Sequence, residues 1–391
     1  MPNAESVMQP DHREDRPMSS DVANATMLSE LCGALADEAS TSAATPDREK
    51  ALRGPYHIIN ANAVLVSSKT AKYRGRGGDN FILSPLFSGC RATGWKKTNP
   101  QVDTGLTLAT AMAVSGAAIN PDAGVGGEGV TRQPVLSVLM GLFNIRLGYW
   151  HANPNPDARK LGRLKWMHSF PWLLFRRRST PNMIYPGLSE SFGRGQLNEH
   201  EPFVLLTDGG HFENLGLYEL VRRRLKLIVV VDGGADPDYT FGDLANAIEK
   251  VRADFGALIE ISSAELNTLI PRRRESDSQD KDSLPCAERG YLVATIRYAS
   301  RQVGTERGGS SEPAEETGTL LYLTTTFFKE LKADLHGYRQ THPEFPDQPT
   351  ADQFLDEKQF EAYRELGYQT AMQAIGQLSA QTSWTVSVSF D

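Results

Sequence analysis

The sequence has 391 residues, of which 40% are hydrophobic and 23% are charged, and its formal net charge is -7. The length leaves room for one large domain or two ordinary ones with a substantial core, and the composition is typical of a soluble globular protein. The acidic balance argues against a general nucleic-acid binder, so we expect no nucleic-acid partner.

Cysteine usage and the terminal composition bear on the cellular compartment. Cys32, Cys90 and Cys286 are far apart and form no CxxC pair, so they indicate neither a disulfide framework nor a zinc site. The first 16 residues lack the apolar core of a signal peptide, and no run approaches the roughly 18 apolar residues of a spanning helix. We therefore predict a cytoplasmic protein that meets membranes only peripherally and uses neither a cofactor nor a metal.

Composition divides the chain into three parts. Residues 1–50 are rich in Ala, Ser, Asp, Glu and Thr, which predicts a disordered arm. Residues 51–380 should form the ordered domain. Residues 381–391 should be a closing strand or tail, because alternate positions are apolar: Trp384, Val386, Val388 and Phe390.

Helices and strands are predicted in both halves of this domain. Ala, Leu and Met predict a helix over 106–118, and apolar residues at helical spacing predict another over 134–150. Farther on, apolar runs alternate with amphipathic segments. We predict strands over 203–207, 227–231 and 257–261 with helices over 214–226 and 244–255, the second capped by Thr240. Such strand–helix–strand units predict a parallel sheet with right-handed crossovers.

Asp208 follows the first of these strands directly. Open α/β sheets bind ligands beyond the carboxyl ends of their strands. Gly209 and Gly210 come next, and they allow a sharp turn and a close approach to the carboxylate. A carboxylate placed in this way is suited to proton transfer.

The run from Thr207 to Gly216 resembles the Asp-Gly-Gly and asparagine motif of patatin-like phospholipases and related cytosolic phospholipases. Three further segments, 54–60, 109–118 and 350–354, are similar to bacterial members of that family. The resemblance extends from about Pro55 to Tyr368.

The resemblance implies an α/β fold, namely a patatin-like three-layer parallel sheet with flanking helices. It also implies a lipid acyl hydrolase that acts on a lipid or phospholipid ester through a Ser-Asp dyad. Asp208 matches the general base of that dyad, with Gly209, Gly210 and Asn214 as supporting motif residues.

The sequence departs from the family pattern because it contains no GxSxG nucleophile elbow and no glycine-rich oxyanion loop before one. The resemblance therefore implies the C-terminal portion of the catalytic domain, without the first strands that bear the nucleophile. We expect the chain to be inactive alone and to need an upstream segment or another chain. Ser115 is a weaker nucleophile candidate within the sequence, since it follows a helix rather than a strand.

Missing strands would also affect association. The strands over 203–207 and 227–231 would then present an apolar face and an unpaired edge to water. We therefore expect the isolated chain to be oligomeric or prone to aggregation.

Two alternatives to an acyl hydrolase remain open. One is a non-catalytic remnant that binds lipid or a partner. The other is a metal-dependent transferase that uses Asp208 and Asp232, because Asp232, Asp236 and Asp238 could converge on an ion. Acidic residues in a loop rich in Gly and Pro are, however, also typical of turns and helix caps.

Residues 166–178 are aromatic and then basic. The residues concerned are Trp166, Phe170, Trp172, Phe175, Arg176, Arg177 and Arg178. This order is typical of an interfacial anchor on an anionic membrane. It also fits a buried loop with solvated arginines, and Pro171 interrupts any helix there.

Overall fold

The computed structural model describes residues 56–98, 106–118, 147–158, 197–273, 284–300, 316–349 and 354–381. The chain divides into two compact units, Met1–Phe212 and Glu213–Asp391. The predicted arm, the aromatic and basic segment 166–178 and the alternating C-terminal segment lie outside the described residues. In the part that is described, every helix is too short or too polar to span a lipid bilayer.

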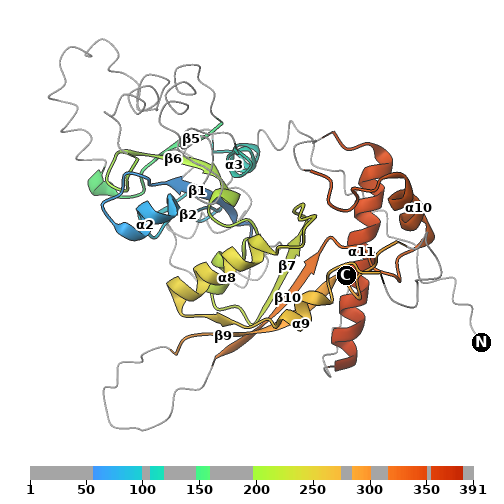
Figure 1. Ribbon diagram of the computed structural model, residues 1–391. Helices are drawn as coiled ribbons and strands as arrows, with labels where there is room; N and C mark the ends of the chain where they lie inside the picture. The colour runs from blue at the N-terminus through green and yellow to red at the C-terminus, as the bar shows by residue number, and fades with distance from the viewer. Residues whose placement is uncertain are drawn as a thin grey trace, which may run out of the picture. The chain divides into compact units, whose positions relative to one another are not determined.

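The described part of the first unit is built on a six-stranded antiparallel sheet in the order β4-β3-β2-β1-β6-β5 (Figure 1). Its strands are β1 (Ile59–Val64), β2 (Gly78–Leu83), β3 (Phe87–Cys90), β4 (Gly94–Lys97), β5 (Tyr149–Ala152) and β6 (Phe203–Asp208). Between β1 and β2 the short helix α2 (Ala71–Arg76) ends at Gly77, whose φ of 75° lets the chain turn back into the sheet.

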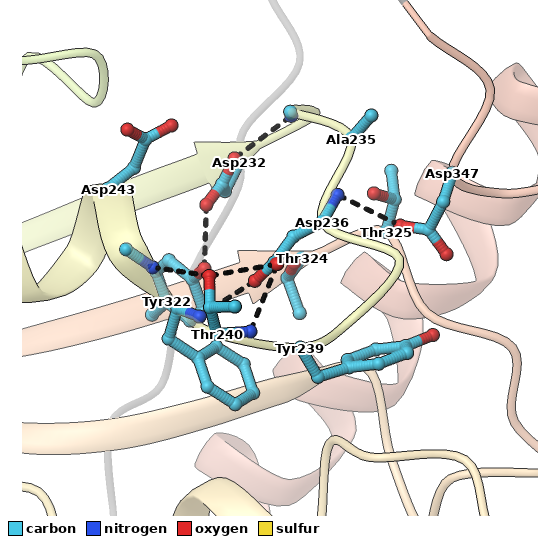
Figure 2. Close-up of a pocket in the computed structure, with 13 residues that line it drawn as sticks. Asp232, Ala235, Asp236, Tyr239, Thr240, Asp243, Tyr322, Thr324, Thr325 and Asp347 are labelled. Carbon is cyan, nitrogen blue, oxygen red and sulfur yellow. Dashed lines mark hydrogen bonds between the residues drawn. The ribbon is translucent and has the colours of Figure 1, made fainter.

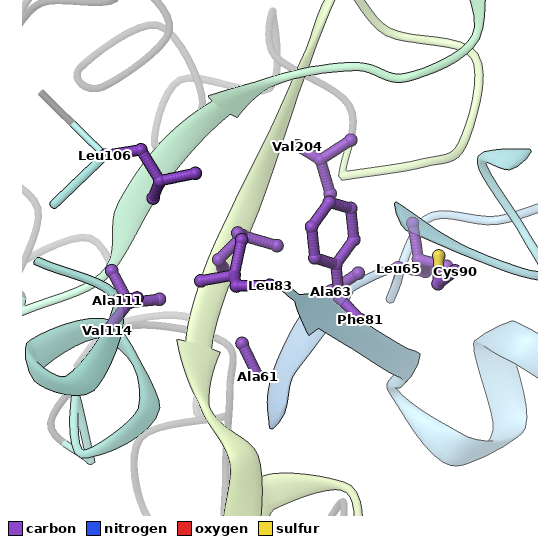
Figure 3. Packing of buried hydrophobic residues seen from close by; sticks show 11 residues of the cluster. Ala61, Ala63, Leu65, Phe81, Leu83, Cys90, Leu106, Ala111, Val114 and Val204 are labelled. Atoms are coloured by element: carbon purple, nitrogen blue, oxygen red, sulfur yellow. The ribbon is translucent and has the colours of Figure 1, made fainter. Parts of the chain in front are cut away.

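The core of this unit lies between the sheet and helix α3 (Leu108–Ser115), as Figure 3 shows. Phe81 is fully buried and meets His151 edge to face with ring centroids 5.3 Å apart. Helix α3 contributes the small residues Ala111 and Val114, which allow it to pack closely on β1 and β6. Thr107 caps this helix by accepting the Thr110 N–H. A helix is therefore confirmed within the predicted range 106–118, but it covers only 108–115.

The second unit contains a mixed sheet in the order β7-β10-β9-β8 (Figure 1). Its described elements are α7 (Leu217–Arg222), β7 (Leu227–Asp232), α8 (Gly242–Phe255), β8 (Leu258–Ile259), α9 (Ser263–Asn267), β9 (Tyr291–Arg297), β10 (Thr317–Thr324), α10 (Ala333–Thr341) and α11 (Glu357–Gln381). Strands β7 and β10 are parallel, whereas β9 is antiparallel to both of its neighbours. Helix α11 packs on β9 and β10 through Ala374, which contacts a cluster of Tyr291, Leu321 and Leu323.

The α/β class predicted from the sequence is confirmed, but the predicted strand pairing over 203–261 is wrong. Strand β6 lies in the first sheet between β1 and β5, antiparallel to both. Strand β7 belongs to the second sheet, where its parallel neighbour is β10. Strand β8 pairs antiparallel with β9. Strands β6 and β7 thus find their partners outside the next strand–helix unit, whereas β8 pairs with the next strand in the chain but antiparallel to it.

Two local predictions also need correction. The helix expected over 134–150 lies mostly outside the described residues, and its last two residues, Tyr149 and Trp150, belong to strand β5. Thr240 is not the N-cap residue of α8, since that helix begins after Phe241, which has a φ of 51° and no side-chain cap. The Thr240 hydroxyl does accept the Gly242 N–H at the start of the helix, at 3.3 Å, and it donates to Asp236.

Candidate functional site

Asp208 ends strand β6, and a single 3-10 turn, Gly209–His211, follows it directly. Its Oδ1 accepts the Gly210 N–H at 2.7 Å, which fixes the half-buried carboxylate at the end of the strand. Among the described residues no donor reaches Oδ2. One carboxylate oxygen is therefore anchored while the other retains its capacity to accept a proton.

The neighbouring strand leaves no room for a side chain at position 209. The turn lies against strand β1, where Ala61 is paired with Asp208. A Cβ atom at position 209 would come within 2.8 Å of the Asn60 carbonyl oxygen. Because that oxygen belongs to the backbone of a paired strand, it cannot move aside easily, and only glycine fits.

A buried polar network supports the turn, and no sequence motif predicted it. The Thr207 hydroxyl lies 3.0 Å from His211 Nδ1 and accepts the Asn62 side-chain amide at 3.4 Å. All three residues are buried. Thr207 and His211 are only four residues apart, but Asn62 comes from 145 residues earlier in the chain. No local pattern could therefore have identified it.

The network makes stability in acid depend on His211. Burial lowers the pKa of His211, although nearby Asp208 and a hydrogen bond with the Ala118 backbone oppose that shift. The folded state thus prefers neutral histidine, and the contribution of His211 to the free energy of unfolding is fully present above the unfolded pKa of about 6.5. This contribution is lost as the pH drops from about 6.5 to the lower pKa of the folded state. We expect His211→Gln to lose less thermal stability than the wild type between about pH 7.5 and about pH 5.5.

Thermal melts monitored by circular dichroism at several pH values in that range measure this difference. His57→Gln is the matched control, because it makes the same substitution at an exposed position outside the buried network. Equal losses of melting temperature in the wild type and in His211→Gln would show that His211 is not held neutral.

Ser115 is the last residue of α3, and it is half-buried. The chain immediately after it lies against the end of β6, since the Asp208 N–H donates to the Ala117 carbonyl at 3.2 Å. The structure therefore brings the segment that carries Ser115 to the strand that carries Asp208. The side chains of Ser115 and Asp208 make no hydrogen bond with each other.

The remaining predicted site residues belong to the second unit. The Asn214 amide donates to Asp243 Oδ2 at 2.8 Å. Asp232 accepts the Gly234 N–H at 3.0 Å, and Asp236 accepts the N–H and the hydroxyl of Thr240. The interpretation of Asp232 and Asp236 as turn-forming residues is thus confirmed. Within the described ranges no three His, Cys, Asp or Glu side chains are grouped so that they could hold a metal ion.

The sequence matches no protein-family model and no curated protein. In structure the chain is weakly similar to human GIVD cytosolic phospholipase A2, with a TM-score of 0.35 and 15% sequence identity. The similarity covers 83% of this chain but only 44% of that phospholipase, so the chain spans less than half of its length.

Proposed function

We propose that this chain contributes the aspartate base of a patatin-like lipid acyl hydrolase. The observation that supports the proposal is the position of Asp208 at the end of β6, with Oδ1 held by the Gly210 N–H and with Gly209 fitted against the Asn60 carbonyl. Together with the Asp-Gly-Gly and asparagine motif, this is an arrangement in which a carboxylate can act as a general base.

In the proposed reaction Asp208 takes the proton of a serine hydroxyl while the serine oxygen attacks the ester carbonyl of a lipid or phospholipid. The proton then passes to the leaving alcohol, and water later releases the fatty acid from the acyl-enzyme. The serine and the oxyanion donors come from a segment or chain outside this sequence. The proposed enzyme is cytoplasmic, and it contacts the membrane peripherally through residues 166–178.

The test compares the chain alone with the chain joined to the in-frame sequence encoded upstream. We expect the purified chain to show little hydrolysis of a p-nitrophenyl ester or a phospholipid and no serine labelled by a fluorophosphonate, since a base without a nucleophile forms no acyl-enzyme. Activity and labelling should appear when the upstream sequence or a nucleophile-bearing partner is added.

Other outcomes would favour the alternatives. Labelling of Ser115 in the isolated chain would place the nucleophile within this sequence. Lipid binding without any turnover, even with the upstream sequence present, would favour a non-catalytic remnant. Loss of activity on adding a chelator would favour a metal-dependent transferase.

A further inference from the structure

Strand β7 lies at the edge of its sheet and is paired only with β10 in the part of the chain that the structure describes. At its start the Lys226 carbonyl accepts the Thr319 N–H at 2.8 Å, and at its end the Asp232 carbonyl accepts the Thr325 N–H at 3.2 Å. The even-numbered residues of β7 therefore bond to β10. Backbone groups point to alternate sides of a strand, so the odd-numbered residues direct their N–H and C=O groups to the open side. These residues are Leu227, Val229 and Val231.

The side chains of the same three residues are exposed on one face of the sheet. Beside them in register on β10, Leu321 and Leu323 are buried, because α11 packs over them through Ala374. Helix α11 thus covers this face at β10 but leaves it open at β7. Leu227, Val229 and Val231, here called the β7 edge, therefore combine free backbone groups with exposed apolar side chains. Such an edge is a template for a further strand.

Residues 384–391 have the pattern of a strand that fits this edge. Apolar residues alternate with small polar ones, and an aspartate follows: Trp384, Thr385, Val386, Ser387, Val388, Ser389, Phe390 and Asp391. Alternating β-branched and aromatic residues suit a strand with one apolar face. The seven residues 384–390 extend over about 23 Å, and the six residues of β7 over about 20 Å, so the two lengths match.

An antiparallel arrangement matches the two sequences position by position. Directly opposite residues of an antiparallel pair have their side chains on the same face. With one choice of register, every exposed apolar residue of the β7 edge lies opposite an apolar residue of the segment. The pairs are Val231 with Val386, Val229 with Val388 and Leu227 with Phe390. The same register places Asp391 opposite Lys226, which is exposed.

Charge distinguishes the two possible directions of the segment. Four carboxylates surround a hollow at the carboxyl end of β7, those of Asp232, Asp236, Asp243 and Asp347 (Figure 2). In a parallel arrangement Asp391 would approach this acidic end. In the antiparallel arrangement it lies beside Lys226 at the other end of the strand. Like charges in cross-strand contact are destabilising and opposite charges are stabilising, so the antiparallel direction is favoured.

The direction of α11 indicates which chain supplies the segment. Leu366 of α11 belongs to a cluster with Phe327, which follows the end of β10, whereas Ala374 packs farther back along that strand, on Leu321. Helix α11 therefore runs opposite to β10, and its end at Gln381 lies toward the amino ends of β10 and β7. A segment that entered the sheet from there within one chain would run parallel to β7, which is the direction that the charges disfavour.

We propose that two copies of this chain exchange residues 384–391, and that each copy adds them as an antiparallel strand to the β7 edge of the other. Because the exchange is reciprocal, it closes at a dimer. The interface uses only residues of the second unit. It involves no atom of Asp208 and does not depend on the acyl-hydrolase proposal.

Two variants that each block one half of the interface test the exchange. Val229→Lys/Val231→Lys blocks the β7 edge, and Val386→Lys/Val388→Lys blocks the segment. We expect size-exclusion chromatography with light scattering to give a wild-type dimer, at twice the chain mass of 43.0 kDa, and a monomer for each variant alone. An equimolar mixture of the two variants should form a heterodimer at about 100 μM, because one intact edge and one intact segment remain.

Thr382→Lys/Ser383→Lys is the matched control, since it adds the same two charges just ahead of the segment. It should remain a dimer, and circular dichroism melts establish that every variant is folded. Association of Val386→Lys/Val388→Lys alone would show that β7 edges pair with each other. A monomeric wild type would show that the copies do not exchange the segment, and a monomeric mixture would show that the segment does not bind the β7 edge. Each of these three results would overturn the proposal.

Lys226→Glu tests the direction of the segment and does not depend on the lysine variants being folded. It places a negative charge opposite Asp391 twice in each dimer, so the Kd of the dimer should rise by about threefold or more. Adding Asp391→Lys to the same chain restores opposite charges and should return the Kd to that of the wild type. Light scattering over a dilution series measures the Kd. Equal Kd values for the wild type and Lys226→Glu would overturn the antiparallel exchange.

Discussion

Replacing Asp208 with asparagine is expected to lower acyl hydrolysis by about 100- to 10,000-fold in the assembly that contains the nucleophile. Asparagine has nearly the same shape, and its amide oxygen can still accept the Gly210 N–H that holds Oδ1 at 2.7 Å. It cannot take the proton of the serine. The variant should therefore melt like the wild type while the ester assay loses its signal.

Asp232→Asn is the matched comparison, because the two aspartates share their position at a strand end and one backbone hydrogen bond. Asp232 also ends a strand, precedes two glycines and accepts an N–H two residues farther on, that of Gly234 at 3.0 Å. A general loss of turn stability would affect both variants alike, whereas loss of the base affects Asp208→Asn alone. Equal losses of activity would count against Asp208 as the base.

The sequence predicted individual elements better than it predicted their partners. The apolar runs over 203–207 and 227–231 do form strands, because β-branched and aliphatic residues suit a buried sheet. Their pairing could not be predicted, since an apolar run looks the same in a parallel and an antiparallel sheet. The pair Ala61 and Asp208 joins residues whose separation in the chain hides them from any local pattern.

The candidate sites show the same limit. Asp208, Gly209 and Gly210 are consecutive, so the turn could be predicted from the motif, and the structure adds the Asn60 carbonyl that explains Gly209. In the second unit, the Asp236 N–H donates a hydrogen bond to the carboxylate of Asp347, which lies 111 residues farther along the chain. The sequence indicated Asp232 and Asp236 as turn residues, but it gave no reason to connect them with Asp347.

Association of the isolated chain is the other prediction with a large expected effect. The sequence predicts open edges at both 203–207 and 227–231. For the first this is wrong, because β6 lies between β1 and β5. Strand β7 is the edge of its sheet, and three apolar side chains on one face are exposed: Leu227 at 58%, Val229 at 48% and Val231 at 75%.

No charged side chain interrupts this exposed face, although natural edge strands usually carry one that discourages pairing with other chains. We therefore expect the isolated chain to form oligomers or aggregates at about 10 μM. Replacing both Val229 and Val231 with lysine should shift it towards the monomer, because two charges on the exposed face oppose edge-to-edge pairing. Size-exclusion chromatography with light scattering measures the shift.

Thr295→Lys is the control, since it adds a lysine at an exposed position of β9, an interior strand of the same sheet. It should leave the elution profile unchanged if the edge strand drives association. A wild-type chain that is monomeric at this concentration and melts cooperatively would contradict the prediction. The second unit would then need no further strand on β7, and a self-sufficient binding module would become the better description than a part of a larger catalytic domain.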